Sequence, residues 1–310
     1  MRRSTAIKVA ASAALAAGLA APLLRRRLRL PPPLVTAVAA TAPFALCVLV
    51  PRTRARDVGV CVLQMWAYVA TYKMPYDDPA ALERRVRVEY PVRIDRALGL
   101  GTTPTLRLQR AHGTPGRFSW WEKVLVWSHW LWFLFPHGTA LYLLVRHRER
   151  FPRGAALIYA TFDVGVIGYW AIPTAPPWYA AAAGHMADGL TPELRRMMVE
   201  YGEHFWKSGW QPLYGVLGGN PLAAMPSLHF ATSVTAAHLL SETGPAAGAF
   251  GWAYAGTLGV ALVYLGEHYV VDLAAGLALA ECVRRVAPIA APAAQRLSRA
   301  MRALETVARP

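Results

Sequence analysis

The chain has 310 residues, of which 55% are hydrophobic and 16% are charged, and its formal net charge is +15. A net charge of this size would suit a nucleic-acid-binding protein, but the arginines gather between apolar runs, where they favour lipid headgroups over a nucleic-acid groove. The sequence contains no glycine-rich phosphate loop, zinc-ligand spacing or RNA-binding signature. The composition therefore excludes a nucleic-acid partner and indicates an integral membrane protein.

Apolar runs of about 20 residues, the length that crosses a bilayer as a helix, recur along the chain. We expect spans, in chain order, at 5–24, 31–50, 57–74, 122–145, 154–173, 226–241, 246–265 and 267–286. The predicted fold class is all-α, a polytopic transmembrane bundle with a six-span core and about two N-terminal spans. We divide it into N-terminal anchor spans (1–56), a six-helix membrane domain (57–286) and a cytoplasmic basic tail (287–310).

Arginines set the predicted orientation. The ends of the third, fourth, fifth and eighth spans carry them, at Arg52, Arg54, Arg56, Arg146, Arg148, Arg150, Arg153, Arg284 and Arg285. These positions fall on one side, which the positive-inside rule makes cytoplasmic. The arginines within 25–29 fall on the other side. Either the first run, which we interpret as a retained anchor, does not cross, or these arginines bind outer-leaflet phosphates.

Two long segments, 75–120 and 174–225, then face outward from the plasma membrane and are expected to cover a site. In the first, the sequence predicts a short amphipathic helix over 80–89 that stops before Pro91, and a second helix over 105–111. In the second, the prolines of 173–178 prevent regular helix because proline lacks a donor and fixes φ. A helix is expected over 192–205.

Two histidines, His229 and His268, each begin an apolar run and so lie at the same membrane face. His268 comes four residues before Asp272, and residues four apart share one face of a helix. The carboxylate can therefore fix the tautomer of His268 and leave its other ring nitrogen free to act. His229 can protonate a leaving oxygen. Two helix N-termini at this place favour a phosphate, and Ser227 adds a hydroxyl donor.

These groups predict phosphoryl transfer. If both histidines act on one phosphate, their reactive nitrogens are expected about 5–7 Å apart. A metal site built from His229, His268 and Asp272 is the competing interpretation, but the sequence offers no glutamate or further histidine at ligand spacing. No cofactor is therefore expected.

Three motifs in chain order resemble the type 2 phosphatidic acid phosphatase superfamily, and more specifically its inositol phosphorylceramide synthase-like branch. They are Pro173-Thr174-Ala175-Pro176-Pro177-Trp178, Pro226-Ser227-Leu228-His229 and His268-Tyr269-Val270-Val271-Asp272. The resemblance covers the six core spans. It implies that His268 forms a phosphohistidine, that Asp272 orients His268 and that His229 is the general acid. It also implies that Ser227 binds phosphate and that no metal is required.

Two cationic motifs of that family are missing from this chain. Residues 169–178 stand where the family has a lysine followed seven residues later by Arg-Pro, and Ala261-Leu262 replace a Ser-Arg pair. The phosphate charge must therefore be balanced from elsewhere, and the arginine fork suits two phosphate oxygens. We predict Arg93 and Arg96 for this role. Further candidates are Lys73, Arg107, Arg110 and Lys207.

Other polar residues inside the predicted spans have simpler interpretations. We expect His129, His137 and His238 to be packed or hydrogen-bonded structural residues, because buried polar groups readily find partners. Asp163 lies well inside the bilayer, where carboxylates are rare. It either pairs with a polar group on a neighbouring span, such as His129 or His137, or belongs to a substrate channel.

The sequence thus predicts an outward-facing, metal-independent enzyme that removes or transfers a phosphoryl-containing headgroup of a membrane lipid. Attack by water in the second step would make it a lipid or polyprenyl phosphate phosphatase. Attack by an alcohol such as inositol or a sugar would make it a phosphotransferase, which the branch resemblance favours. A non-catalytic lipid-binding or lipid-transport protein is the alternative of another class, and the missing lysine–arginine motif favours it.

Overall fold

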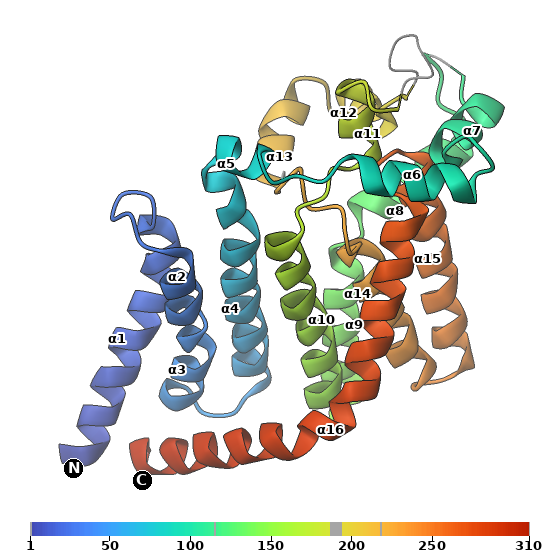
Figure 1. Ribbon diagram of the computed structural model, residues 1–310. Helices are drawn as coiled ribbons and strands as arrows, with labels where there is room; N and C mark the ends of the chain where they lie inside the picture. Colours follow the sequence, from blue (N-terminus) through green and yellow to red (C-terminus); the bar gives the residue numbers. More distant parts are fainter. Residues whose placement is uncertain (1, 115, 187–193, 218, 310) are drawn as a thin grey trace.

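The computed structural model describes residues 2–114, 116–186, 194–217 and 219–309, and over these residues it is helical, with only isolated bridges between extended segments. Long helices stand side by side in a bundle, and shorter helices form a layer across one end of it (Figure 1). This arrangement confirms the predicted all-α class. We call the layer of short helices the outer layer.

The bundle helices follow the predicted spans. They are α1 (Arg2–Leu24), α2 (Pro32–Ala39), α3 (Thr41–Leu49), α4 (Arg54–Lys73), α8 (Trp120–Trp130), α9 (Leu134–Arg146), α10 (Phe151–Ala171), α14 (Leu228–Ser241), α15 (Pro245–Tyr264) and α16 (Val270–Ala308).

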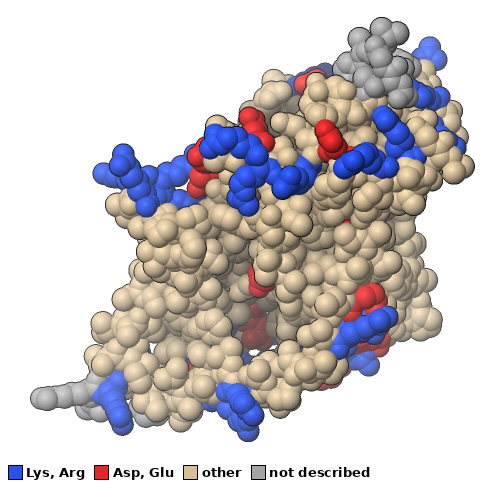
Figure 2. Space-filling view, viewed as in Figure 1, with Lys and Arg blue, Asp and Glu red and all other residues tan. Residues whose placement is uncertain are grey.

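The surface supports a membrane-embedded bundle. Among the described residues, four stretches are long and apolar enough to cross a membrane by length and composition: Arg3–Leu24, Pro32–Leu49, Phe151–Ala171 and Pro245–Tyr264. Figure 2 shows lysines and arginines gathered toward the two ends of the molecule, with a largely uncharged band between them. Such a band is what a hydrocarbon layer requires, because unpaired charges are costly there.

Two predicted spans are each divided into two helices. The run 31–50 is interrupted at Ala40, between α2 and α3, and the run 122–145 is interrupted at 131–133, between α8 and α9. Hydropathy does not detect such breaks, because the residues at a break are as apolar as their neighbours. The second break matters for the site described below.

The last helix is much longer than the predicted span. It was expected to end near 286, but α16 continues to Ala308, contains Pro288 and Pro292, and bends so that its last part runs across the foot of the bundle (Figure 1). The Ser4 hydroxyl donates to the Ala308 carbonyl at 2.7 Å. The predicted basic tail is therefore a helix that packs against the N-terminal helices.

The outer layer comes from the two long segments predicted to cover a site. Its elements are η1 (Met74–Asp77), α5 (Pro79–Glu83), α6 (Glu89–Leu98), α7 (Pro104–His112), α11 (Pro177–Ala182), α12 (Met197–Trp206), η2 (Lys207–Gly209) and α13 (Trp210–Leu217). The helix predicted over 105–111 is confirmed as α7. Residues 192–193 of the helix predicted over 192–205 lie outside the described residues. Residues 194–196 are not helical, and α12 begins only at Met197.

The single helix predicted over 80–89 is wrong. Residues 84–88 separate α5 from α6, and Arg87 instead bridges to Thr174, which also bridges to Ala223. Pro91 does not block a helix because it lies in the first turn of α6, where backbone N–H groups have no partner within the helix. The bridges tie three distant segments of the outer layer together.

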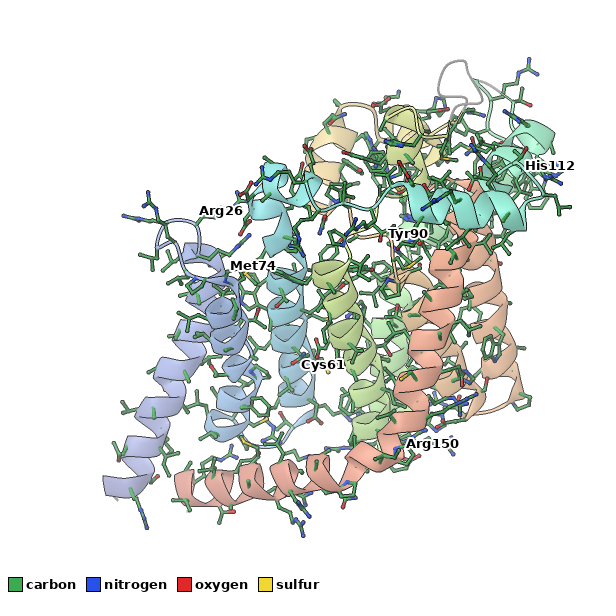
Figure 3. All side chains as sticks on the ribbon, viewed as in Figure 1. Arg26, Cys61, Met74, Tyr90, His112 and Arg150 are labelled. Atoms are coloured by element: carbon green, nitrogen blue, oxygen red, sulfur yellow. The ribbon has the colours of Figure 1, made fainter. Side chains whose placement is uncertain are left out.

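The arginines at the first connection face the outer-layer end of the bundle, and the structure shows what they bind. Arg25 and Arg26 both pair with Asp77 of η1, each at 2.7 Å. Figure 3 shows Arg26 and Met74 at the same end of the bundle. Partial burial raises the pKa of the Asp77 carboxyl, but hydrogen bonds from both guanidinium groups outweigh it and hold that pKa below its usual range. These two arginines therefore have a partner within the protein.

The helices α14 and α16 approach each other closely because α16 has a glycine at the contact. A Cβ added at Gly276 would lie 2.5 Å from the Ser227 backbone oxygen, closer than real Cβ atoms come to another heavy atom. The amide of Ser227 also donates to the Asp272 carbonyl at 3.0 Å. The starts of the two helices are therefore joined directly.

We predict that Gly276→Ala destabilises the fold by about 1–3 kcal/mol, because the added methyl group must push two backbones apart. The measurement is the thermal unfolding midpoint of the purified protein in detergent. Gly256→Ala on α15 is the matched control, since a Cβ there meets nothing within 4 Å. It should leave the midpoint unchanged or raise it, because alanine favours helix over glycine. Equal midpoints for the two variants would contradict the close-contact argument.

Candidate functional site

The two histidines singled out in the sequence lie against each other at the outer-layer end of the bundle. His229 Nδ1 is 3.1 Å from His268 Nε2, and His268 Nδ1 is 3.3 Å from Asp272 Oδ2. His268 and Asp272 are buried, whereas His229 is partly exposed. Three side chains, from the first turns of α14 and α16 and from the turn before α16, therefore form one line of hydrogen bonds.

The line of hydrogen bonds fixes where protons lie. Asp272 Oδ2 also accepts from the Tyr269 amide at 2.9 Å. A carboxylate can only accept, so the Nδ1 of His268 must donate to it. In a neutral imidazole the other nitrogen then carries a lone pair, so His268 Nε2 accepts from His229 Nδ1–H. The arrangement presents one imidazole nitrogen free of a proton, beside a second imidazole that holds one.

The distance between the two reactive nitrogens is shorter than expected. We expected about 5–7 Å, enough for a phosphate between them, and the structure has 3.1 Å. The physical reason is that two imidazoles, one donating and one accepting, satisfy each other when no anion separates them. An anion that enters must replace this hydrogen bond.

The carboxylate of Asp95 caps the helix that begins just after His268. It accepts from the Val270 amide at 2.9 Å and from the Val271 amide at 3.1 Å, the first two residues of α16. Burial raises the pKa of the Asp95 carboxyl above its usual range, and the two hydrogen bonds offset this only in part. Helix α6 thereby holds the outer layer on the start of α16.

The residues predicted to bind phosphate lie in different places. Ser227 is fully buried and N-caps α14, its hydroxyl oxygen accepting from the Phe230 amide at 3.3 Å. Arg93 is exposed and Arg96 is partly exposed, on either side of Asp95 in α6. Neither arginine takes part in the hydrogen bonds that join the two histidines.

A third histidine and a tryptophan, which sequence reasoning did not assign to the site, pack on His229. The His129 ring stacks on it with centroids 5.0 Å apart, and the Trp132 centroid lies at 4.0 Å. Trp132 occupies the break between α8 and α9, so the interruption of the predicted span brings this ring to the site. The Nδ1 of His129 has no hydrogen-bond partner within the described part of the chain, so of the two expected roles, packed or hydrogen-bonded, the observed contact is packing.

The remaining polar residues of the spans have ordinary partners. His137 Nδ1 donates to the Phe133 carbonyl, and His238 Nε2 pairs with Glu281, each at 2.7 Å. Their interpretation as structural residues is consistent with these contacts. Asp163 accepts from Gln64 of α4 at 2.7 Å.

The contact of Asp163 confirms that it pairs with a polar group on a neighbouring span, although the partner is Gln64 and not His129 or His137. Gln64 was missed because an amide in an apolar run gives no signal of which neighbouring helix it faces.

Tyrosine hydroxyls bond in and around the segment 169–178, where the resembling family has a cationic motif. The Tyr169 hydroxyl donates to the Pro226 carbonyl at 3.0 Å and lies 3.4 Å from the Leu228 amide. Tyr90, at the start of α6, has its hydroxyl 2.9 Å from Thr174 Oγ1 (Figure 3). These contacts position the turn before His229, but they supply no positive charge.

Comparison with known proteins identifies the family. The sequence profile described as the PAP2 superfamily matches residues 91–283. The chain belongs to the PAP2 superfamily. It is also similar to the phosphoinositol dihydroceramide synthase of Bacteroides thetaiotaomicron, with 31% identity over 146 residues, which are 46% of this chain and 47% of the relative. The match thus spans about half the length of that relative. No solved structure matches.

Membership of the PAP2 superfamily confirms the resemblance seen in the motifs and supports a membrane enzyme of the lipid phosphatase and phosphotransferase class. The matched region begins inside α6 and ends inside α16, so it contains both histidines of the site and the Asp95 cap. The helices α1 to α4 lie before the matched region.

We predict that Asp95→Ala lowers stability by about 1–2 kcal/mol, because two backbone N–H groups at the start of α16 lose their acceptor. The measurement is the thermal midpoint in detergent, together with hydrogen exchange of the Val270 and Val271 amides. Asp78→Ala removes a similar cap from the short exposed helix α5 and should cost less. If both variants lower the thermal midpoint equally, the Asp95 cap contributes no more to stability than the Asp78 cap, and the prediction is wrong.

Proposed function

We propose that the protein is a lipid phosphotransferase or phosphatase that acts through a phosphohistidine on His268, with Asp272 and His229 as its catalytic partners. The observation that carries this proposal is the line of hydrogen bonds at 3.3 Å and 3.1 Å through the three side chains. It leaves the Nε2 of His268 with a lone pair and places a proton on the neighbouring imidazole.

In the first step, the phosphate group of a lipid enters between the imidazoles. The lone pair of His268 Nε2 attacks phosphorus, a nitrogen–phosphorus bond forms, and the bond from phosphorus to the leaving oxygen breaks. His229 gives its proton to that oxygen. The Asp272 carboxylate stabilises the positive charge that develops on the His268 ring.

In the second step, an oxygen nucleophile attacks the phosphohistidine, and His229 now accepts the proton of that nucleophile. The nitrogen–phosphorus bond breaks and both histidines return to their first state. Water as nucleophile gives hydrolysis, and an alcohol gives headgroup transfer. This scheme requires no metal.

Transfer is the form that the similarity to a named relative favours. The relative is called a phosphoinositol dihydroceramide synthase, and this supports an inositol-phosphate or related headgroup as the transferred group, with an alcohol as its acceptor. Hydrolysis of a lipid or polyprenyl phosphate is the alternative within the same chemistry. The two differ only in the second nucleophile.

We also propose that the site faces outward from the plasma membrane and that residues 57–286 form the catalytic unit. The support is the group of arginines at the opposite end of the bundle, including Arg52, Arg54 and Arg146, because short cytoplasmic loops carry such residues. Labelling of a single introduced cysteine in the outer layer of intact cells, by a reagent that does not cross membranes, tests this orientation.

We predict that His268→Ala lowers turnover of phosphatidic acid or phosphatidylinositol by about 10⁴-fold or more, because the nucleophile is lost. His229→Ala should lower it by about 10²–10⁴-fold, the usual contribution of a general acid. Initial rates with labelled lipid in mixed micelles measure both. His238→Ala is the matched control, since His238 lies on the same helix and pairs with Glu281. It should keep near wild-type activity.

The covalent adduct gives a second test. With 4-nitrophenyl phosphate the leaving group needs no proton, so His229→Ala should still form the adduct and should break it down slowly. Phosphate should then remain on His268 in an alkali-stable, acid-labile bond. Absence of such an adduct in both the wild type and this variant would exclude the phosphohistidine mechanism.

A further inference from the structure

The site has a deficit of positive charge. A phosphate group brings one or two negative charges to His229 and His268, and such charges require cations or charge-assisted donors. Tyr169 and Ala261-Leu262 stand where the resembling family has cationic motifs. The side chain of Arg93 is exposed, and within the described part of the chain no hydrogen bond joins it to His229 or His268.

One arginine of the outer layer, Arg196, lies beside the residue that precedes His268. It directly precedes α12, and its Nε is 3.8 Å from Glu267 Oε1. Arg196 is therefore a cation of the outer layer that lies next to the neighbour of His268 in the chain.

The guanidinium of Arg196 is held by aromatic side chains from two other segments. Its central carbon lies 3.6 Å from the centroid of the Trp178 ring, and its Nη2 donates to the Tyr214 hydroxyl at 2.7 Å. The Trp178 amide in turn donates to the Gly266 carbonyl at 3.1 Å, in the turn just before His268. An arginine fixed in this way loses little further freedom when it binds a ligand.

The guanidinium is nevertheless not saturated. Its Nε is buried and has no hydrogen-bond acceptor within the described ranges, and Glu267 Oε1 is likewise buried without a donor there. At 3.8 Å the two atoms are too far apart for a hydrogen bond. The Arg196 side chain is still 29% exposed, so a ligand can reach it. A buried unpaired donor is costly, and an anion would satisfy it.

We propose that Arg196 binds the phosphate group of the substrate beside His268, with Trp178 and Tyr214 holding its guanidinium in place. This inference rests on the proposed phosphoryl chemistry. The ligand class is a phosphate monoester or diester, and the planar fork of the guanidinium can bind two of its oxygens.

The carboxylate of Glu267 makes the inference testable. Burial raises the pKa of the Glu267 carboxyl above its usual range, while Arg196, His268 and a hydrogen bond from Trp178 lower it without offsetting burial. In the ionised form it would repel a phosphate bound to Arg196. Removing this charge should therefore strengthen phosphate binding if Arg196 is the receptor, and should mimic the loss of Arg196 if the pair is only structural.

The neighbouring arginine is a matched control. Arg195 has its guanidinium fully engaged: it donates to Glu200 at 2.7 Å and to the Thr114 carbonyl at 2.8 Å, and it lies over the Phe118 ring. It differs from Arg196 by one position and carries the same charge. Its loss tests whether any arginine of this segment would have the same effect.

The experiment measures binding of inorganic phosphate and of phosphatidic acid in detergent micelles to the purified full chain, by titration calorimetry. Arg196→Gln should weaken binding about 10- to 100-fold, as expected for the loss of charge-assisted hydrogen bonds. Arg196→Lys should fall between this variant and the wild type. Glu267→Gln should bind phosphate at least as tightly as the wild type. Arg195→Gln should have an affinity within about twofold of the wild type, because its guanidinium is already paired and its loss removes no ligand contact.

Several results would overturn the inference. They are wild-type affinity in Arg196→Gln, equal weakening in Arg195→Gln, weakening in Glu267→Gln, or no phosphate binding by the wild type.

A change for phosphatidic acid alone would assign the site to the lipid headgroup, and a change for both ligands would assign it to phosphate itself. If the adduct forms on His268 but phosphate binding is unchanged in Arg196→Gln, only the inference about Arg196 is contradicted. If Arg196→Gln loses phosphate binding but the wild type forms no adduct, the phosphohistidine proposal is contradicted instead.

Discussion

The structure depends on one contact, the direct packing of the starts of α14 and α16. The Ser227 amide bonds to the Asp272 carbonyl at 3.0 Å, and Gly276 leaves room for the Ser227 backbone. Because both helices begin here, their N-terminal partial charges and the side chains of His229 and His268 point into one place. The bundle below fixes the two helices, and the outer layer above closes on them through the Asp95 cap. The chemistry follows from this geometry.

Much of the fold could be predicted from the sequence because a bilayer imposes long apolar helices. Hydropathy located the bundle spans, although not the division of two of them. The short spacing of His268 and Asp272 indicated their contact, although His268 lies just before α16 and not on the helix face with Asp272. Hydropathy could not give the break that brings Trp132 onto His229, since the residues there are apolar as well. It also could not give the full length of α16, because its basic, Ala-rich end is amphipathic and not apolar.

The meeting of His229, His268 and Asp272 could be predicted from the sequence, but the side chains around them could not. His229, His268 and Asp272 lie within motifs, so local order in the sequence identifies them. Arg196 carries no such signal, because its contacts come from Trp178 and Tyr214 in separate segments of the outer layer. The stacking of His129 likewise depends on how α8 packs against α14. Contacts between distant segments are tertiary information, and a single sequence does not display them.

The direct bond between the imidazoles also leaves room for a single hydrogen between the two rings. Because the nitrogens are 3.1 Å apart, that hydrogen belongs to one ring at a time. While it belongs to His229, the attacking nitrogen of His268 is bare but covered. The resting site therefore shields its own nucleophile, and only a group that parts the two rings can expose it.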